Sequence, residues 1–226
     1  MTRRRLIFWP PERTRGFTII ELMIATMIFS VVLLLVTSGI LQVARVYYKG
    51  LTEANTQTTA RGIIDNISQS IQFSGGPVSE TVGTSPGTDY AFCINNNQFT
   101  YRLGRQVRNN PTASDQTWHA IVVRTITGSC STTAAQVLSS QTVTGGRDLM
   151  GQDMRLANLV VDDIGSNRFR ITVRVVYGDS ELLFSPSAPG DTTGYGRADA
   201  VCRPERASTQ FCAVSELSTV VVKRVQ

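Results

Sequence analysis

Histidine and catalytic motifs are scarce in this 226-residue chain. His119 is its one histidine, and no two of its four cysteines form a C-x-x-C pair, so we expect no metal site. The P-loop, the glycine-rich dinucleotide-binding pattern and the H-E-x-x-H pattern are all missing. We therefore expect neither a cofactor nor an enzymatic activity.

Charge is absent from residues 17–44 with one exception, Glu21. An apolar run of this length can cross a bilayer, because about 20 helical residues span the hydrocarbon. A carboxylate inside that run costs about 2.5–3.5 kcal/mol on insertion scales. Glu21 therefore either has a partner or lies close enough to the boundary to reach the headgroups. A cleavable secretory signal does not fit, since the run is too long and no small-residue cleavage site follows it.

The residues that begin this run form a motif. Two residues separate Gly16-Phe17-Thr18 from Glu21-Leu22-Met23. This arrangement resembles the cleavage and methylation motif of type IV prepilins and type II secretion pseudopilins. The resemblance implies that prepilin peptidase cuts between Gly16 and Phe17, and that the new Phe17 amine is N-methylated. It also implies that Glu21 meets the Phe17 amine of a neighbouring subunit during filament assembly. Such a buried ion pair fixes register more reliably than it adds stability.

Most of the positive charge precedes the apolar run. Five arginines and one glutamate in residues 1–16 account for four of the five formal positive charges, which leaves about +1 for the rest. Because Lys and Arg favour the cytoplasmic side, we expect the C-terminal part to be exported. The expected parts are a leader (1–16), a transmembrane and assembly segment (17–45) and an exported domain (46–226). The protein would be a single-pass membrane protein that later joins an extracellular or periplasmic filament.

The exported part contains all the cysteines, namely Cys93, Cys130, Cys202 and Cys212. An even number outside the cytoplasm indicates disulfides. Three pairings are possible. We favour Cys202–Cys212, which closes a short polar loop, together with Cys93–Cys130.

Apolar periodicity predicts one long helix over residues 17–72. Its second half carries an apolar stripe at helical spacing, formed by Ala60, Ile63, Ile64, Ile67 and Ile71. That stripe has to pack on the domain that follows. The result is an α+β fold, with the amphipathic half of the helix against an antiparallel β-sheet, which agrees with the pilin-like architecture that the motif implies.

Alternating apolar residues predict the strands. Two hairpins are expected at residues 90–103 and 156–177, with turns at 95–97 and 165–167. Further strands are expected at 119–127 and 217–225, and weaker ones near 136–143 and 181–184. One face of 168–177 carries Arg168, Arg170 and Arg174, which indicates that this face is exposed.

Three further arginines lie close together in the sequence beside Tyr101. These are Arg102, Arg105 and Arg108. A basic loop flanked by an aromatic residue can hold a nucleic-acid backbone and stack a base, so the three are candidate DNA contacts. A solvated charged loop is the alternative, and binding that falls steeply with salt would distinguish the two.

These observations favour a minor pilin-like structural subunit of a type IV pilus or a related filament. The word minor rests on the large domain with its long loops and second cysteine pair. A type II secretion pseudopilin is the alternative within this class, and a membrane-anchored surface receptor or adhesin, for example for DNA uptake, is the alternative outside it. Expected partners are other pilin or pseudopilin subunits through the N-terminal helix, prepilin peptidase, and membrane lipid before assembly. A receptor needs neither cleavage at Gly16 nor an assembly role for Glu21.

Overall fold

The computed structural model describes residues 16–73, 75–79, 82–83, 89–110, 116–127, 146–187, 198–204 and 209–224. The chain divides into two compact units, with the boundary between Ala44 and Arg45. The predicted leader up to Arg15, the predicted strand near 136–143 and Cys130 lie outside the described residues.

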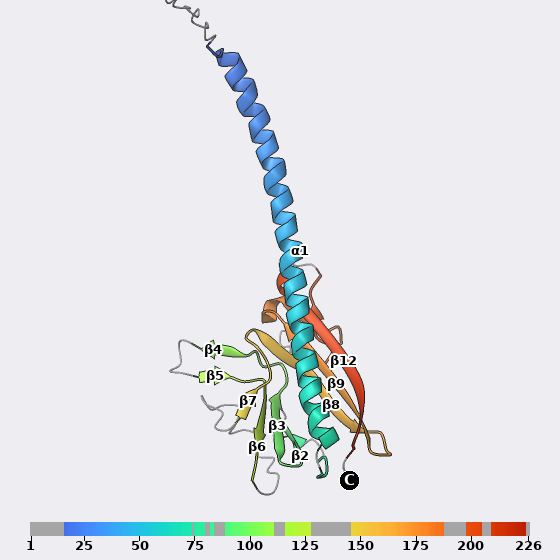
Figure 1. The fold of residues 1–226 in the computed structure, drawn as a ribbon. Helices are drawn as coiled ribbons and strands as arrows, with labels where there is room; N and C mark the ends of the chain where they lie inside the picture. Colours follow the sequence, from blue (N-terminus) through green and yellow to red (C-terminus); the bar gives the residue numbers. More distant parts are fainter. Residues whose placement is uncertain are drawn as a thin grey trace, which may run out of the picture. The chain divides into compact units, whose positions relative to one another are not determined.

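Helix α1 runs from Ile19 to Phe73 and is the long helix that the sequence predicts (Figure 1). In the first unit, its side chains are exposed from Ile19 to Val43. Among the described residues, α1 is the one helix long and apolar enough to cross a membrane. By length and composition, the apolar part of α1 is able to span a bilayer as a helix.

In the second unit, the last turns of α1 supply one side of the core. The buried residues on α1 are Thr56, Ala60, Ile63, Ile64, Ile67 and Ile71. The predicted apolar stripe is therefore confirmed, because all five of its members are buried. The helix ends at Phe73, shortly before Gly75-Gly76-Pro77, which cannot continue it.

Two antiparallel sheets complete the core of the second unit. The first has the order β1-β2-β3-β6-β7 and the second the order β12-β9-β8. The first sheet contains β1 (Val82–Gly83), β2 (Asp89–Ile94), β3 (Asn97–Arg102), β6 (Ile121–Thr125) and β7 (Gly146–Asp148). The second contains β8 (Met154–Asp163), β9 (Arg168–Tyr177) and β12 (Ala213–Val222).

Small elements lie between consecutive strands within each sheet. Two short antiparallel pairs are β4 (Arg108–Asn110) with β5 (Gln116–Trp118), and β10 (Leu183–Phe184) with β11 (Val201–Cys202). Single-turn 3-10 helices are η1 (Ser180–Leu182) and η3 (Thr209–Phe211).

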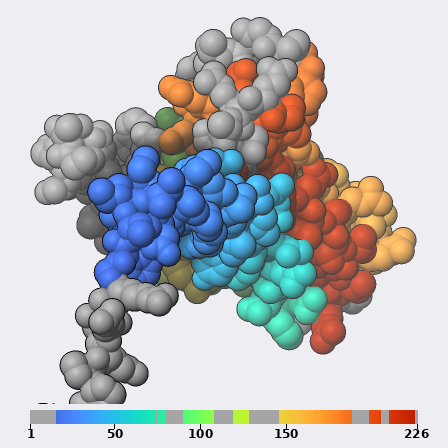
Figure 2. All heavy atoms as spheres, turned by 90° about the horizontal axis from the view of Figure 1, so that it is seen from above, coloured from blue at the N-terminus to red at the C-terminus, as the bar shows by residue number. Residues whose placement is uncertain are grey.

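One apolar cluster joins α1 to both sheets. It includes Ile67 from the helix, Phe92 and Phe99 from the first sheet, and Ile171 and Val173 from the second. Phe92 and Phe99 stack with their ring centroids 4.9 Å apart. The α+β, pilin-like architecture expected from the sequence is thus confirmed. The end of α1 and β12 lie side by side at the surface (Figure 2), where the Arg224 amide donates to the Gln72 carbonyl.

Both predicted hairpins are confirmed. The β2–β3 turn places Asn95 at φ 53°, and the β8–β9 turn places Gly165, Ser166 and Asn167 at φ 82°, 56° and 56°. Glycine and asparagine adopt this left-handed conformation more readily than other residues, which is why these turns are readable from sequence.

Several predicted boundaries are wrong. The last strand begins at Ala213 rather than Leu217, because pairing with β9 continues through Tyr177 although the apolar alternation fades. The segment 181–184 is half 3-10 helix and half strand. The pair β4–β5 formed without any alternation that predicted it.

The basic face of β9 is only partly as predicted. Arg168 and Arg170 are exposed. Arg174 instead donates to Glu216 Oε2 at 2.6 Å and to the Ala200 carbonyl at 3.0 Å, so it holds neighbouring segments together.

Candidate functional site

The N-terminal turn of the first unit holds the residues of the predicted cleavage and assembly motif. Gly16, Phe17 and Thr18 precede the first helical residue, Ile19. Phe17 is 84% exposed, and among the described residues no atom beyond the chain neighbours of Gly16 lies within 4 Å of the position that a Cβ on it would occupy. Within the described part of the chain, nothing covers the Gly16–Phe17 peptide bond.

Thr18 and Glu21 cap the helix reciprocally. The Thr18 amide donates to Glu21 Oε2 at 3.0 Å, and the Glu21 amide donates to Thr18 Oγ1 at 3.3 Å. The Thr18 hydroxyl adds a second donor to the same carboxylate oxygen at 2.9 Å. This is a capping box, which satisfies backbone amides that a helix start otherwise leaves unpaired. The Thr-x-x-Glu spacing in the sequence is the signal that predicts such a box.

Three further hydroxyls of the apolar segment are also satisfied. Thr26, Ser30 and Thr37 each donate to a backbone carbonyl three or four residues earlier, at 2.8–2.9 Å. Such bonds remove the cost of placing a hydroxyl in hydrocarbon. Glu21 is thus the one charged side chain of residues 16–44, and its hydrogen bonds stay within its own first turn.

Residues 13–37 match the prokaryotic N-terminal methylation motif. This is the type IV prepilin-type signature, and it coincides with the residues on which the resemblance was based. Comparisons of the chain with curated proteins and with solved structures returned no match. The prepilin-type signature supports a type IV pilin-like protein that prepilin peptidase processes and that assembles with other pilins. It points to a structural subunit, and together with the apolar helix it is consistent with a membrane-anchored, exported protein.

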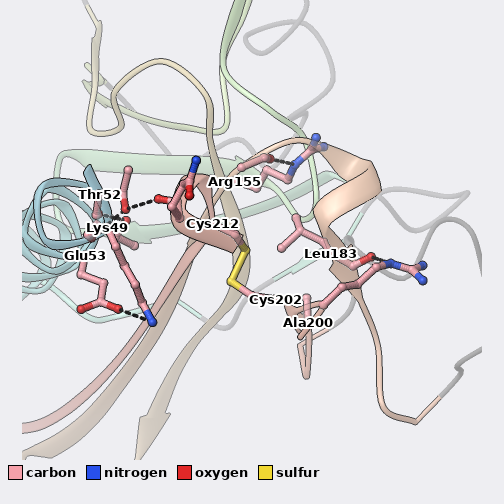
Figure 3. The surroundings of a disulfide bond; sticks show 12 residues. Lys49, Thr52, Glu53, Arg155, Leu183, Ala200, Cys202 and Cys212 are labelled. Atoms are coloured by element: carbon pink, nitrogen blue, oxygen red, sulfur yellow. Dashed lines mark hydrogen bonds and ion pairs between the residues drawn. A yellow bond between two sulfur atoms is a disulfide. The ribbon is translucent and has the colours of Figure 1, made fainter. Parts of the chain in front are cut away.

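A disulfide lies beside the helix at the start of the second unit. Cys202, at the end of β11, is bonded to Cys212, which precedes β12 (Figure 3). Between them, the Gln210 carbonyl accepts a hydrogen bond from Thr52 Oγ1 at 3.4 Å. This is the pairing that the sequence analysis favoured. Cys93 is also disulfide-bonded; because Cys130 lies outside the described residues, the Cys93–Cys130 pairing stays a prediction.

The candidate DNA contacts do not lie on a freely solvated loop. Arg102 ends β3 and Arg105 follows it, and both are half-buried. The segment between β3 and β4 packs on β8, because the guanidinium of buried Arg155 donates to the Gly104 carbonyl at 3.1 Å and to Gln106 Oε1 at 3.0 Å. Arg108 begins β4. Nucleic-acid binding by the three stays a prediction.

His119 is a buried histidine with an acidic partner. Its side chain is 11% exposed, and its Nδ1 lies 2.7 Å from Asp148 Oδ2. Burial raises the pKa of Asp148, and the hydrogen bond with His119 opposes that rise. His119 Nε2 is buried without a hydrogen-bond partner in the described part of the chain. Asp148 lies 29 residues away in the sequence, so this pair could not be predicted from local patterns.

The chain also contains one Gly-x-Ser-x-Gly pattern, at residues 83–87. In hydrolases this pattern sits where a strand turns into a helix. Here Gly83 ends strand β1, and the other four residues of the pattern lie outside the described residues. Among the described residues, no group of three or more His, Cys, Asp or Glu could hold a metal ion.

Proposed function

We propose that the mature chain is a minor subunit of a type IV pilus or a related filament. It is a structural protein that waits in the membrane until it joins the filament through its N-terminal helix. Residues 1–16 are its leader, 17–45 its membrane and assembly segment, and 46–226 its exported domain. The large disulfide-bonded domain supports a minor rather than a major subunit.

One observation carries the proposal. A single carboxylate, Glu21, follows the Gly16–Phe17 bond by one helical turn, in a segment that is otherwise uncharged and exposed. In an assembled filament the Phe17 amine of a neighbouring subunit is the cation that would pair with it. Without such a partner, the carboxylate serves only to cap its own helix.

The first test is the N-terminal sequence and mass of the protein recovered from its own host. The proposal expects a chain that begins at N-methylated Phe17. A chain that keeps Arg3 to Arg15 would contradict processing, and the receptor or adhesin function would then be favoured. Recovery of the protein from secretion-system assemblies rather than from pili would instead favour the pseudopilin alternative.

Two substitutions at Glu21 separate assembly from capping. Glu21→Gln keeps an oxygen that can accept the Thr18 hydrogen bonds but removes the charge, whereas Glu21→Ala removes both. We expect both variants to be cleaved at Gly16, to remain in the membrane and to be missing from purified filaments. Immunoblots of membrane and filament fractions measure this. Normal incorporation of the Gln variant would mean that Glu21 acts only as a helix cap.

A further inference from the structure

A groove lies between the two sheets of the exported domain. Its volume is about 780 Å³. One wall is the C-terminal half of β8, from Leu159 to Asp163, and the other includes Tyr90 and Tyr101 of the first sheet. The two tyrosine rings stack with centroids 5.2 Å apart, so this wall is rigid and largely apolar.

The β8 wall is the edge of its sheet, since the strand order is β12-β9-β8. The first half of this edge is covered, because the Val107 amide donates to the Met154 carbonyl at 3.0 Å and the Gly104 amide to the Leu156 carbonyl at 2.8 Å. A bulge between Leu156 and Asn158 follows. In the described residues, no strand pairs with the edge beyond that bulge.

The hydrogen-bond pattern shows where the backbone of this second half points. At the hairpin turn the Ile164 amide donates to the Arg168 carbonyl at 2.9 Å, so Ile164 is bonded to β9. Antiparallel ladders alternate, which directs the backbone groups of Leu159, Val161 and Asp163 to the free side. The Leu159 carbonyl confirms this direction, because it accepts the Tyr101 hydroxyl at 3.3 Å across the groove.

This row of amides and carbonyls repeats every second residue, and within the described part of the chain it is free at Val161 and Asp163, since the Leu159 carbonyl already accepts from Tyr101. An extended polypeptide offers donors and acceptors at the same spacing, which lipid and sugar do not. Because the tyrosine wall stands opposite, the groove admits one extended segment rather than the edge of a second folded sheet.

The negative charge at the end of the groove favours a basic residue at one end of that segment. Asp162 and Asp163 line it and are exposed. Asp162 is paired in register with Arg170, whereas Asp163 is paired with Phe169 and has no cross-strand cation. Lys223 also lines the groove, but its ammonium donates to the Gly76 carbonyl at 2.9 Å. A strand antiparallel to β8 brings its N-terminal end to Asp163, so a basic residue is favoured there.

We propose that this groove binds an extended segment of a different protein, which adds antiparallel to the free edge of β8 and carries a Lys or Arg near its N-terminal end. The proposal goes beyond filament assembly and does not depend on cleavage at Gly16. Peptide binding in the groove can therefore be absent while the chain still assembles into a filament, and it can be present in a chain that does not assemble.

The test is a selection of linear nonapeptides from a displayed random library on the mature full chain in nanodiscs. Enriched peptides should alternate β-branched residues and carry a basic residue near the N-terminus. N-methylation of alternate backbone amides should weaken binding at least about tenfold, because each removes a ladder hydrogen bond, and methylation of the intervening amides should not. An N-methyl scan without alternation, or a selection that enriches no peptide, overturns the proposal.

Protein variants locate the site. Val161→Pro removes the edge amide and should weaken the selected peptides at least about tenfold. Asp163→Asn keeps the acceptor for the Gly165 amide and should weaken basic peptides several-fold, whereas Asp65→Asn on the exposed face of α1 should not. If Val161→Pro does not fold, the N-methyl scan on the wild-type chain decides. Wild-type self-association that Asp163→Asn abolishes would identify a second copy as the occupant and overturn the proposal.

Discussion

At the scale of single residues, buried ionisable side chains in the described part of the second unit have specific hydrogen-bond partners. Arg155 is 5% exposed and donates to Gly104, Gln106 and Gly178. His119 and Asp148 hold each other at 2.7 Å. Removing one member of such a pair leaves the other buried and unsatisfied, which costs more than the bond itself contributes.

His119→Ala should therefore destabilise the protein by about 1–3 kcal/mol in the free energy of unfolding. Asp148 has a raised pKa through burial, so its ionised form already weakens the fold as the pH rises above the ordinary aspartate range. Without His119 that penalty grows, and the loss should be larger at pH 7 than at pH 4. Denaturant unfolding at both pH values measures it.

His119→Asn is the matched control, because its amide nitrogen stands near the position of the histidine Nδ1. It should keep the bond to Asp148 and lose less stability than the Ala variant. An equal loss from both variants, independent of pH, would show that the cavity and not the hydrogen bond causes the effect.

Asp199 is perturbed in the opposite direction. Hydrogen bonds from Ser185 Oγ at 2.6 Å and from the Ser187 amide at 2.8 Å lower its pKa from 3.8 to about 2. A lowered pKa in the folded state adds stability above pH 4, and that stability is lost as the pH falls towards 2.

Ser185→Ala should raise the pKa of Asp199 towards 3.8, because it removes the first of these causes. Titration of the Asp199 carboxyl carbon by NMR measures the change. Ser187→Ala keeps the amide donor, so its effect should be smaller. A pKa that stays near 2 in the Ser185 variant would contradict the assignment.

At the scale of elements, the Cys202–Cys212 disulfide ties β11 to β12 and holds η3 against α1. Phe211 of η3 lies with its ring centroid 6.1 Å from that of Tyr48, and the Thr52 hydroxyl bonds the neighbouring carbonyl (Figure 3). The loop is short, with a sequence separation of 10.

Replacing both cysteines with alanine should lower the free energy of unfolding by roughly 3 kcal/mol in the chain-entropy model. It should also speed trypsin cleavage after Arg206, because the loop loses its covalent anchor. Digestion followed by mass spectrometry measures the rate. Thr52→Val removes only the hydrogen bond to the Gln210 carbonyl and should have a smaller effect. Unchanged cleavage in the double variant would show that the disulfide does not restrain the loop.

At the scale of the whole molecule, features encoded locally were predictable from the sequence. The isoleucine stripe of α1 and the asparagine- and glycine-containing turns of both hairpins each depend on neighbours in the chain. The motif around Gly16 and Glu21 was readable for the same reason. Features that join distant residues were not. Glu216 binds Arg174 from 42 residues away, and the β8 groove exists only because a bulge ends the cover of one sheet edge.

The capping box at Thr18 and Glu21 has a consequence for supply. The Glu21 carboxylate already accepts two hydrogen bonds from Thr18 of its own helix. Pairing of two such helices in the bilayer would therefore gain little from this carboxylate. In the proposed filament subunit, monomers would then accumulate in the membrane without pairing. Growth of a filament would replace the contact of Glu21 with Thr18 by a contact with the Phe17 amine of a neighbouring subunit. Monomers would thus stay available for assembly without pairing beforehand.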